Sequence, residues 1–213
     1  MAEGVMDIDL ELQKYNVSRE TISNFSAFIN ILSEWNSKIN LVSKNSLIDV
    51  WQRHVLDSLQ LINYIPSDAA NIVDIGSGGG FPAIVLAIAL KEKNPAAKIT
   101  MVESITKKTL YLNDVCSRLQ LNNARVVNDR VENLHLQNVD IITARAVASL
   151  NVLCGYAQKI GGKNTELLLL KGKSFAEEQR EAMQNWSFEC QTFANHYSED
   201  GVVVKINKLR KRK

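Results

Sequence analysis

Residues 71–90 read NIVDIGSGGGFPAIVLAIAL, and this stretch decides how the rest of the chain is interpreted. The apolar β-type run 71–75 stops at Gly76, and a run rich in Ala, Ile and Leu that suits a buried helix follows the glycine cluster. Glycines allow backbone conformations that are closed to other residues and let a ligand approach main-chain N–H groups. The next helix presents unpaired N–H groups and a positive dipole end. The pattern predicts a strand, a tight turn and a helix that bind an anionic, nucleotide-like ligand.

The spacing of the glycines indicates which cofactor binds. The dinucleotide fingerprint G-x-G-x-x-G requires a small residue at position 81, where this chain has Phe81. Gly76, Gly78 and Gly80, preceded by Asp74, instead fit the D/E-x-G-x-G-x-G pattern of S-adenosylmethionine enzymes. A connector that binds nothing is the alternative, but such a connector needs only one or two glycines. S-adenosyl-L-methionine is therefore the expected cofactor.

Composition and length are those of one soluble domain with an appendage. The chain has 213 residues, of which 46% are hydrophobic and 23% are charged. Its three cysteines are widely spaced and form no C-x-x-C pair, so neither a disulfide framework nor a zinc site is predicted. The first ten residues do not resemble a signal peptide, and the apolar stretch 81–90 is far shorter than the roughly 20 residues of a membrane span. We expect a cytoplasmic protein with no membrane and no metal partner.

Positive charge is concentrated at the end of the sequence. The net charge is +2, but five of the 25 basic residues lie within 208–213. Residues 1–207 therefore hold 20 basic and 23 acidic residues, a net charge of −3. Such a basic tail suits RNA phosphates, and a solvated terminus that aids solubility is an equally good interpretation.

The pattern of apolar residues divides the chain into a helical part and an alternating part. Before residue 66, Ser18 is a candidate N-cap for a helix with one apolar stripe, and a second helix is expected over about 47–63, ending before Pro66. From residue 71, strands alternate with helices, which predicts a parallel sheet covered on both faces. We expect a helical cap over 1–66, a Rossmann-like cofactor-binding domain over 67–207 and a basic tail over 208–213.

Seven strands are expected in this α/β fold. The first five alternate with helices, whereas the last two are separated by the turn signal SEDG at 198–201 and should form an antiparallel hairpin at one edge of a mostly parallel sheet. The expected strands are 71–75, 98–103, 124–128, 140–144, 166–170, 188–194 and 202–206. The expected helices between them are 82–91, 106–119, 149–160 and 175–185.

Acidic residues follow the second and third strands, at the sheet edge where ligands of doubly wound folds bind. Glu103 comes 27 residues after Gly76, where a carboxylate can accept hydrogen bonds from both ribose hydroxyls of an adenosine. The alternative is a surface carboxylate beside Lys107 and Lys108. The run 129–132, DRVE, could contact the adenine edge, and a helix-capping role for Asp129 is equally open.

Basic residues follow the fourth and fifth strands. Arg145 comes directly after a buried apolar strand and could hold a phosphate or stack on a base, the alternative being an ion pair with a neighbouring helix. Lys171 and Lys173 are placed to hold RNA phosphates. In the cap, His54 and Asp57 lie about one helical turn apart, and we favour a hydrogen-bonded junction between cap and sheet over acid–base chemistry.

Seven motifs in a fixed order support a family resemblance. They are WNxxxNL at 35–41, RHxLDSL at 53–59, DIGSGxGFP at 74–82, VESxxKK at 102–108, RVE at 130–132, RAVAxL at 145–150 and LKG at 170–172. Together the motifs resemble the glucose-inhibited division protein B (RsmG) family over about residues 15–175. Two departures, Ala83 with Val85 where the family often has glycine and proline, and Val42 where it usually has threonine, affect helix packing and cap geometry.

The resemblance implies an S-adenosylmethionine-dependent methyltransferase that modifies N7 of one guanine in 16S ribosomal RNA of the small subunit. We expect Arg145 to serve the reaction, and Arg53, His54, Lys171 and Lys173 to face the RNA. The expected cofactor contacts are Asp74, Gly76, Ser77, Gly78, Gly80, Phe81, Glu103, Ser104, Asp129, Val131, Glu132 and Arg145. Guanine N7 already carries a lone pair, so alignment of the reactants would matter more than a general base.

Three other functions stay open on the sequence alone. A nicotinamide-dependent oxidoreductase is disfavoured by Phe81, and a non-catalytic RNA-binding module would act through the basic tail. A methyltransferase with a small-molecule or protein acceptor is the third, because a fold does not fix a substrate. We expect a monomer. The exact nucleotide, and the choice between naked RNA and an assembled subunit, are not specified by any residue pattern.

Overall fold

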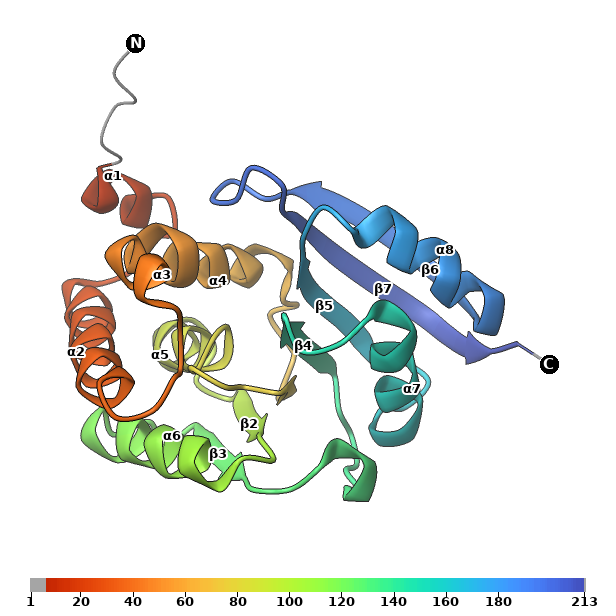
Figure 1. Ribbon diagram of the computed structural model, residues 1–213, viewed down its shortest axis with the longest axis horizontal. Helices are drawn as coiled ribbons and strands as arrows, with labels where there is room; N and C mark the ends of the chain where they lie inside the picture. Colours follow the sequence, from red (N-terminus) through yellow and green to blue (C-terminus); the bar gives the residue numbers. More distant parts are fainter. Residues whose placement is uncertain (1–6, 213) are drawn as a thin grey trace, which may run out of the picture.

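A single seven-stranded sheet organises the computed structural model, which describes residues 7–212 (Figure 1). The strand order is β3-β2-β1-β4-β5-β7-β6; the first five strands pair in parallel, whereas β7 is antiparallel to both β5 and β6. The strands are β1 (Asn71–Ile75), β2 (Lys98–Val102), β3 (Ala124–Val127), β4 (Ile141–Arg145), β5 (Glu166–Lys171), β6 (Trp186–Ala194) and β7 (Val202–Lys211). The predicted α/β fold class is confirmed.

Helices cover both faces of the sheet because the strands alternate between two apolar faces. Ile72 belongs to the hydrophobic cluster on one face and Val73 to the cluster on the other. One face is covered by α5 (Ala83–Lys93) and α6 (Thr106–Arg118), and the other by α7 (Leu150–Ile160) and α8 (Phe175–Asn185). Within residues 7–212, no helix combines the length and the apolar character needed to cross a membrane.

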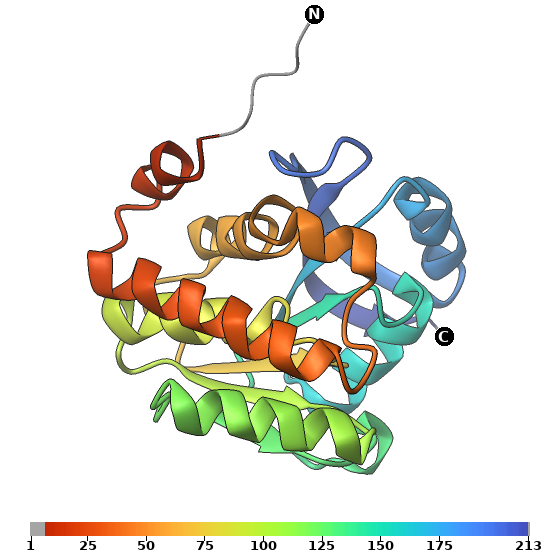
Figure 2. The same ribbon diagram turned by 60° about the vertical axis from the view of Figure 1, so that its left-hand side comes forward.

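Helix α5 is apolar on all sides and is enclosed by its neighbours. Its residues 83–90 are all buried, as expected for a helix packed between a sheet and a further layer. That layer is formed by α2 (Arg19–Asn36) and α4 (Asp57–Leu59), and Figure 2 shows α2 lying across α5. The N-terminal helices therefore complete the hydrophobic core of this face.

The cap differs in detail from the prediction. Ser18 does cap α2, because its hydroxyl accepts a hydrogen bond from the N–H of Thr21 at 3.1 Å. The single helix expected over 47–63 is instead a series of short segments: α3 (Lys44–Ile48), the π-helical η1 (Trp51–Leu56), α4 and the 3-10 helix η2 (Gln60–Tyr64). A further short helix, α1 (Ile8–Gln13), precedes α2. Apolar periodicity cannot distinguish these helix types, because all of them bury one side.

The basic segment is part of the sheet. Strand β7 continues to Lys211, and the N–H of Arg212 still donates to the carbonyl of Asn185 at 2.8 Å, so the tail expected from residue 208 is wrong for 208–212. Leu209 packs against the core, which explains how a charged stretch can continue a strand. Lys213, like residues 1–6 of the expected cap, lies outside the described residues.

Candidate functional site

The glycine-rich turn after β1 requires glycine at its first position. Gly76, Gly78 and Gly80 have φ values of 69°, 49° and 89°, in the left-handed region that favours glycine. The N–H of Gly76 donates to the carbonyl of Val102 at 2.8 Å, which ties the turn to β2. A Cβ atom on Gly76 would lie 2.3 Å from Cγ2 of Val147. A side chain at position 76 would therefore collide with the segment after β4.

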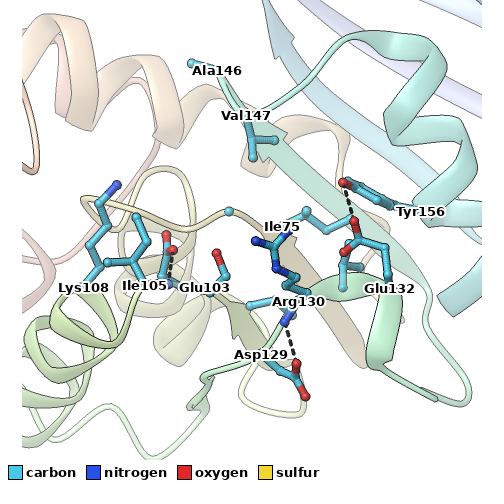
Figure 3. A pocket seen from close by; sticks show the side chains of 14 residues that line it. Ile75, Glu103, Ile105, Lys108, Asp129, Arg130, Glu132, Ala146, Val147 and Tyr156 are labelled. Atoms are coloured by element: carbon cyan, nitrogen blue, oxygen red, sulfur yellow. Dashed lines mark hydrogen bonds between the residues drawn. The ribbon is translucent and has the colours of Figure 1, made fainter.

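A pocket of ≈ 330 Å³ opens beside this turn, and we call it the glycine-turn pocket (Figure 3). It lies where β1, β2 and β3 end, at the carboxyl edge of the parallel strands, as expected for this fold. Its volume is within the range of small-molecule sites. Six of the predicted cofactor contacts line it: Gly76, Glu103, Ser104, Asp129, Val131 and Glu132.

Glu103 is held by backbone N–H groups at the floor of the pocket. The side chain is largely buried, and its carboxylate accepts hydrogen bonds from Gly78 at 3.0 Å and from Ile105 at 2.8 Å. The surface carboxylate considered as the alternative is therefore wrong. Each carboxylate oxygen has a second lone pair, so Glu103 can still accept hydrogen bonds from a ligand.

The turn after β3 orders the other end of the pocket. Oδ1 of Asp129 accepts from the N–H of Arg130 and from Nδ2 of Asn133, both at 2.7 Å, so this carboxylate holds the turn that leads into the short helix η3 (Val131–Asn133). No side chain of the described residues caps η3 itself, so the helix-capping role considered for Asp129 is wrong. Glu132 accepts a hydrogen bond from the Tyr156 hydroxyl at 3.1 Å. Figure 3 shows the Glu132–Tyr156 pair at one end of the pocket, Lys108 and Ile105 at the other, and Arg130 between them.

Four of the predicted cofactor contacts, in or next to the turn, do not line the pocket. Asp74 is buried, accepts a hydrogen bond from Thr143 at 2.6 Å, and its burial raises its pKa from 3.8 to about 7. Ser77 is buried and donates to the carbonyl of Asp74. A Cβ on Gly80 would meet Ile84 at 2.7 Å, and Phe81 packs against Phe28. Contact of these four, and of Gly78, with a cofactor stays a prediction.

Arg145 faces a second cavity between the cap and the sheet. We call this the Arg145 cavity: two adjoining hollows of ≈ 610 Å³ and ≈ 590 Å³ that share Asp57, Arg145 and Ser198. Nη2 of Arg145 donates to the carbonyl of Arg53 at 2.7 Å and lies 3.4 Å from Asp57 Oδ2, so the predicted alternative, an ion pair with a neighbouring helix, is present. Nη1 is buried and has no partner among residues 7–212.

The two cavities meet at the segment after Arg145. Ala146 and Val147 line both the glycine-turn pocket and the Arg145 cavity. Ala146 has a φ of 52°, a left-handed conformation that is uncommon for alanine. This turn directs Arg145 toward the cap while Val147 covers Gly76. A ligand in one cavity would therefore lie beside a ligand in the other.

His54 does not form the hydrogen-bonded junction that the sequence favoured. Its ring stacks on Phe81 with centroids 4.7 Å apart, and neither ring nitrogen has a partner in the described part of the chain. Burial, with Arg145 and Arg53 nearby, lowers the pKa of His54 from 6.5 to about 3. The junction is made by Asp57 instead, which accepts from Asn195 at 2.6 Å and from Gln60 at 3.1 Å. Neutral His54 is unsuited to act as a cation toward RNA phosphates.

The two lysines after β5 differ in their surroundings. Nζ of Lys171 lies 2.6 Å from Glu178 and 2.8 Å from the carbonyl of Ala148, so this ammonium group is already paired. Lys173 and, in the cap, Arg53 are exposed. Contact of Arg53, His54, Lys171 and Lys173 with RNA stays a prediction.

Sequence reasoning missed several residues that line the site. Lys108 and Tyr156 line the glycine-turn pocket, and Asn195 with Ser198 borders the Arg145 cavity. Lys108 lies inside the motif at 102–108, so its position was a usable signal. Tyr156 and the 195–198 turn reach the site only through the packing of α7 and the β6–β7 connection. Among residues 7–212, no three His, Cys, Asp or Glu side chains gather as a metal site would require.

Comparisons with known proteins point to one family. The profile of the GidB family, described as rRNA small subunit methyltransferase G, matches residues 21–201. Proteins named Ribosomal RNA small subunit methyltransferase G from Ruegeria sp. (strain TM1040) and Bartonella tribocorum are 36% and 39% identical, covering 97% and 96% of this chain and 97% and 99% of their own. The solved O-methyltransferase from Bacillus cereus in complex with SAH has a similar fold, with a TM-score of 0.60, 16% identity and coverage of 87% of this chain and 91% of that one.

Proposed function

Because the chain belongs to the rRNA small subunit methyltransferase G (GidB) family, we propose that it transfers a methyl group from S-adenosylmethionine to N7 of a guanine in 16S ribosomal RNA. The observation that carries this proposal is the contact between two cavities. The glycine-turn pocket and the Arg145 cavity share Ala146 and Val147 as a common wall, which suits a reaction between two separately bound molecules.

The glycine-turn pocket fits the adenosine portion of the cofactor. Glu103 has free lone pairs for the ribose hydroxyls, and the apolar side chains of Ile105 and Val131 suit the faces of an adenine ring. The absence of a side chain on Gly76 leaves the backbone approachable beside Val147. The bound cofactor supplies a methyl group on a positively charged sulfur, and the protein holds and orients it.

The Arg145 cavity fits a nucleotide. Nη1 of Arg145 is a buried donor without a partner among the described residues, which suits a guanine O6 or a phosphate oxygen. His54 is neutral and aromatic, so its stack with Phe81 offers an apolar surface rather than a proton. Guanine N7 needs no base to generate the nucleophile, so the protein contributes alignment and exclusion of water.

The RNA context follows from where N7 lies. In an A-form duplex, N7 faces a deep major groove that proteins read poorly, so we expect the target guanine in a loop or in an incompletely assembled particle. Arg53 is exposed and lines the Arg145 cavity, and exposed Lys173 lies between Gly172 and Ser174, which line it, so both side chains can hold phosphates of the RNA. Every residue invoked lies in one chain, so a single copy of the chain suffices for the reaction.

Methyl transfer from labelled S-adenosylmethionine to small-subunit particles of cells lacking this protein tests the proposal. We expect label in 7-methylguanosine of the small-subunit RNA. The Gly76→Ala variant should lose most of its cofactor affinity and activity, because a Cβ there would lie 2.3 Å from Val147. Gly155→Ala is the matched control, because its Cβ would meet only Trp186 at an ordinary 3.8 Å. Intact cofactor binding without label in RNA would refute the RNA substrate.

A further inference from the structure

The second half of β7 extends past its neighbour β5. Pairing between these strands ends at Leu167 opposite Ile206, whereas pairing of β7 with β6 continues to Lys211. The loop 161–164, between α7 and β5, borders the unpaired side of this extension. Between them lies an open hollow of ≈ 750 Å³, which we call the β7 hollow. Figure 1 shows this end of β7 close to the carboxyl terminus.

Positive charge lines the β7 hollow. Lys163, Lys208, Arg210 and Lys211 contribute to its wall, and none of the described residues that line it is acidic. Lys208 is paired with Glu189 at 2.7 Å. The side chains of Lys163, Arg210 and Lys211 make no hydrogen bond or ion pair within 7–212, and all three residues are exposed. Uncompensated charges of one sign around a concave surface attract a polyanion.

The backbone is strained at the rim of this hollow. Lys208 has a φ of 52°, at a bulge where the register shifts between Ser187 and Glu189 of β6. A left-handed conformation is uncommon for lysine and is usual for glycine at such a bulge. Glycine at position 208 would therefore strain the backbone less than lysine does. Compared with glycine, Lys208 adds a positive charge. Bulges also redirect side chains, here those of Lys208 and the residues after it.

The hollow lies at the opposite edge of the sheet from the glycine-turn pocket. Because β7 runs antiparallel to β5, its carboxyl end lies at the amino ends of the parallel strands. Strands of five residues are roughly 17 Å long, so a molecule that reaches both places must span at least that distance. A folded RNA presents phosphates over such distances, whereas a cofactor or a single nucleotide does not.

We propose that the β7 hollow binds phosphate groups of the RNA substrate, as a contact remote from the site of methyl transfer. This inference rests on the proposed function. Lysine and arginine contacts to phosphates fix the position of an RNA without reading its sequence. The hollow therefore favours a large folded RNA over a short oligonucleotide that carries the same target guanine.

Charge removal at the hollow tests this inference. The triple variant Lys163→Gln, Arg210→Gln, Lys211→Gln leaves the Lys208–Glu189 pair at the bulge intact. We expect its affinity for small-subunit RNA to fall about tenfold at physiological salt, and the slope of log affinity against log salt to become less steep by roughly two to three. Affinity for S-adenosylmethionine, and for a short oligonucleotide with the target guanine, should match that of the wild type.

The matched control removes three exposed charges elsewhere: Arg19→Gln in α2, Lys91→Gln in α5 and Lys98→Gln in β2. Equal losses of RNA affinity in the two triple variants, or no loss in the hollow variant, would overturn the inference. The proposed function would still stand if the wild type methylates the RNA. A wild type that binds cofactor but neither binds nor methylates the RNA would overturn both.

Discussion

Asp74 shows how a single residue of the glycine-rich turn couples stability to pH. Its carboxyl group is fully buried; Oδ1 accepts from Thr143, and Oδ2 has no partner in the part of the chain that the structure describes. Burial is the main cause that raises its pKa, while hydrogen bonds from Ser77 and Thr143 oppose it. The folded protein therefore keeps a proton on Asp74 that the unfolded chain releases above its ordinary pKa of 3.8.

The free energy of unfolding should fall as pH rises from about 4 to about 7, because the unfolded chain binds fewer protons than the folded protein in this window. Asp74→Asn carries no such proton. From pH 5 to pH 8, the free energy of unfolding of the wild type should fall by roughly 3 kcal/mol more than that of the variant, since each pKa unit corresponds to about 1.4 kcal/mol. Urea unfolding at the two pH values measures this difference. Parallel pH profiles of the two proteins would show that Asp74 is ionised when folded.

Arg145 is the residue whose side-chain shape should matter most for methyl transfer. Arg145→Lys keeps the charge but replaces the planar guanidinium, in which Nη2 contacts the Arg53 carbonyl and Asp57 and Nη1 is a separate donor, by a single nitrogen on a flexible chain. We expect the rate of methyl transfer to fall at least about tenfold, roughly 1.4 kcal/mol in the barrier. Arg125→Lys, at a residue bonded to Thr100 in the sheet, controls for a general cost of this exchange. An unaltered rate would remove Arg145 from the substrate site.

At the scale of elements, helix α2 tests how far local signals determine the cap. The Ser18 hydroxyl satisfies the N–H of Thr21, so Ser18→Ala should lower the free energy of unfolding by about 1 kcal/mol. Ser23 is exposed within the same helix, where Ser23→Ala should have little effect or slightly stabilise. Denaturant unfolding of both variants measures the contrast. Equal effects would mean that the Ser18 cap contributes nothing beyond helix propensity.

The elements that sequence reasoning predicted well are those whose ends carry local signals. β1 has the predicted bounds because Gly76 ends an apolar run, and α8 has the predicted bounds of 175–185. β7 was predicted too short because its last residues alternate charge with Leu209, which reads as a solvated tail. The bulge at Lys208 also breaks the alternation on which strand prediction relies. The π-helical η1 carries no distinct apolar period.

At the scale of the whole molecule, the cap and the sheet act as one unit. Phe25, Phe28 and Leu32 of α2 belong to the same buried cluster as α5 and one face of the sheet. The hydroxyls of Tyr15, after α1, and Tyr197, after β6, are 2.9 Å apart, so the cap meets the β6–β7 connection beside the Arg145 cavity, which Tyr197 lines. The cap predicted over 1–66 therefore shares its core with the rest of the described chain.

A shared core predicts a single cooperative unfolding transition in which helical and near-ultraviolet signals coincide. Tyr15→Phe removes the bond to Tyr197 while Tyr197 keeps its bond to Glu11, so stability should fall by about 1 kcal/mol with the transition still single. Tyr64→Phe is the control, because the Tyr64 hydroxyl has no hydrogen bond to another described residue. Two separated transitions would contradict the shared core.

The site could be predicted only in part, for reasons that belong to the whole molecule. Gly76, Glu103 and the 129–132 turn were found because sheet topology brings strand ends together. The separation of Arg145 from the glycine-turn pocket depends on the φ of 52° at Ala146. No pattern in the sequence predicts this left-handed conformation. Tyr156 and Asn195 come from elements whose packing is decided by the complete fold. The sequence motifs thus predicted where the pocket lies, whereas the tertiary structure determines which other residues line it.

The strand order also dictates an order in which the strands can pair during folding. β6 is made before β7 but pairs only with β7, which lies between β6 and β5. The five parallel strands can pair with one another first, whereas β6 has no partner until β7 is in place beside β5. Until then its edge is an unpaired template for other chains. A released chain truncated near residue 200 would therefore be most prone to aggregate through β6.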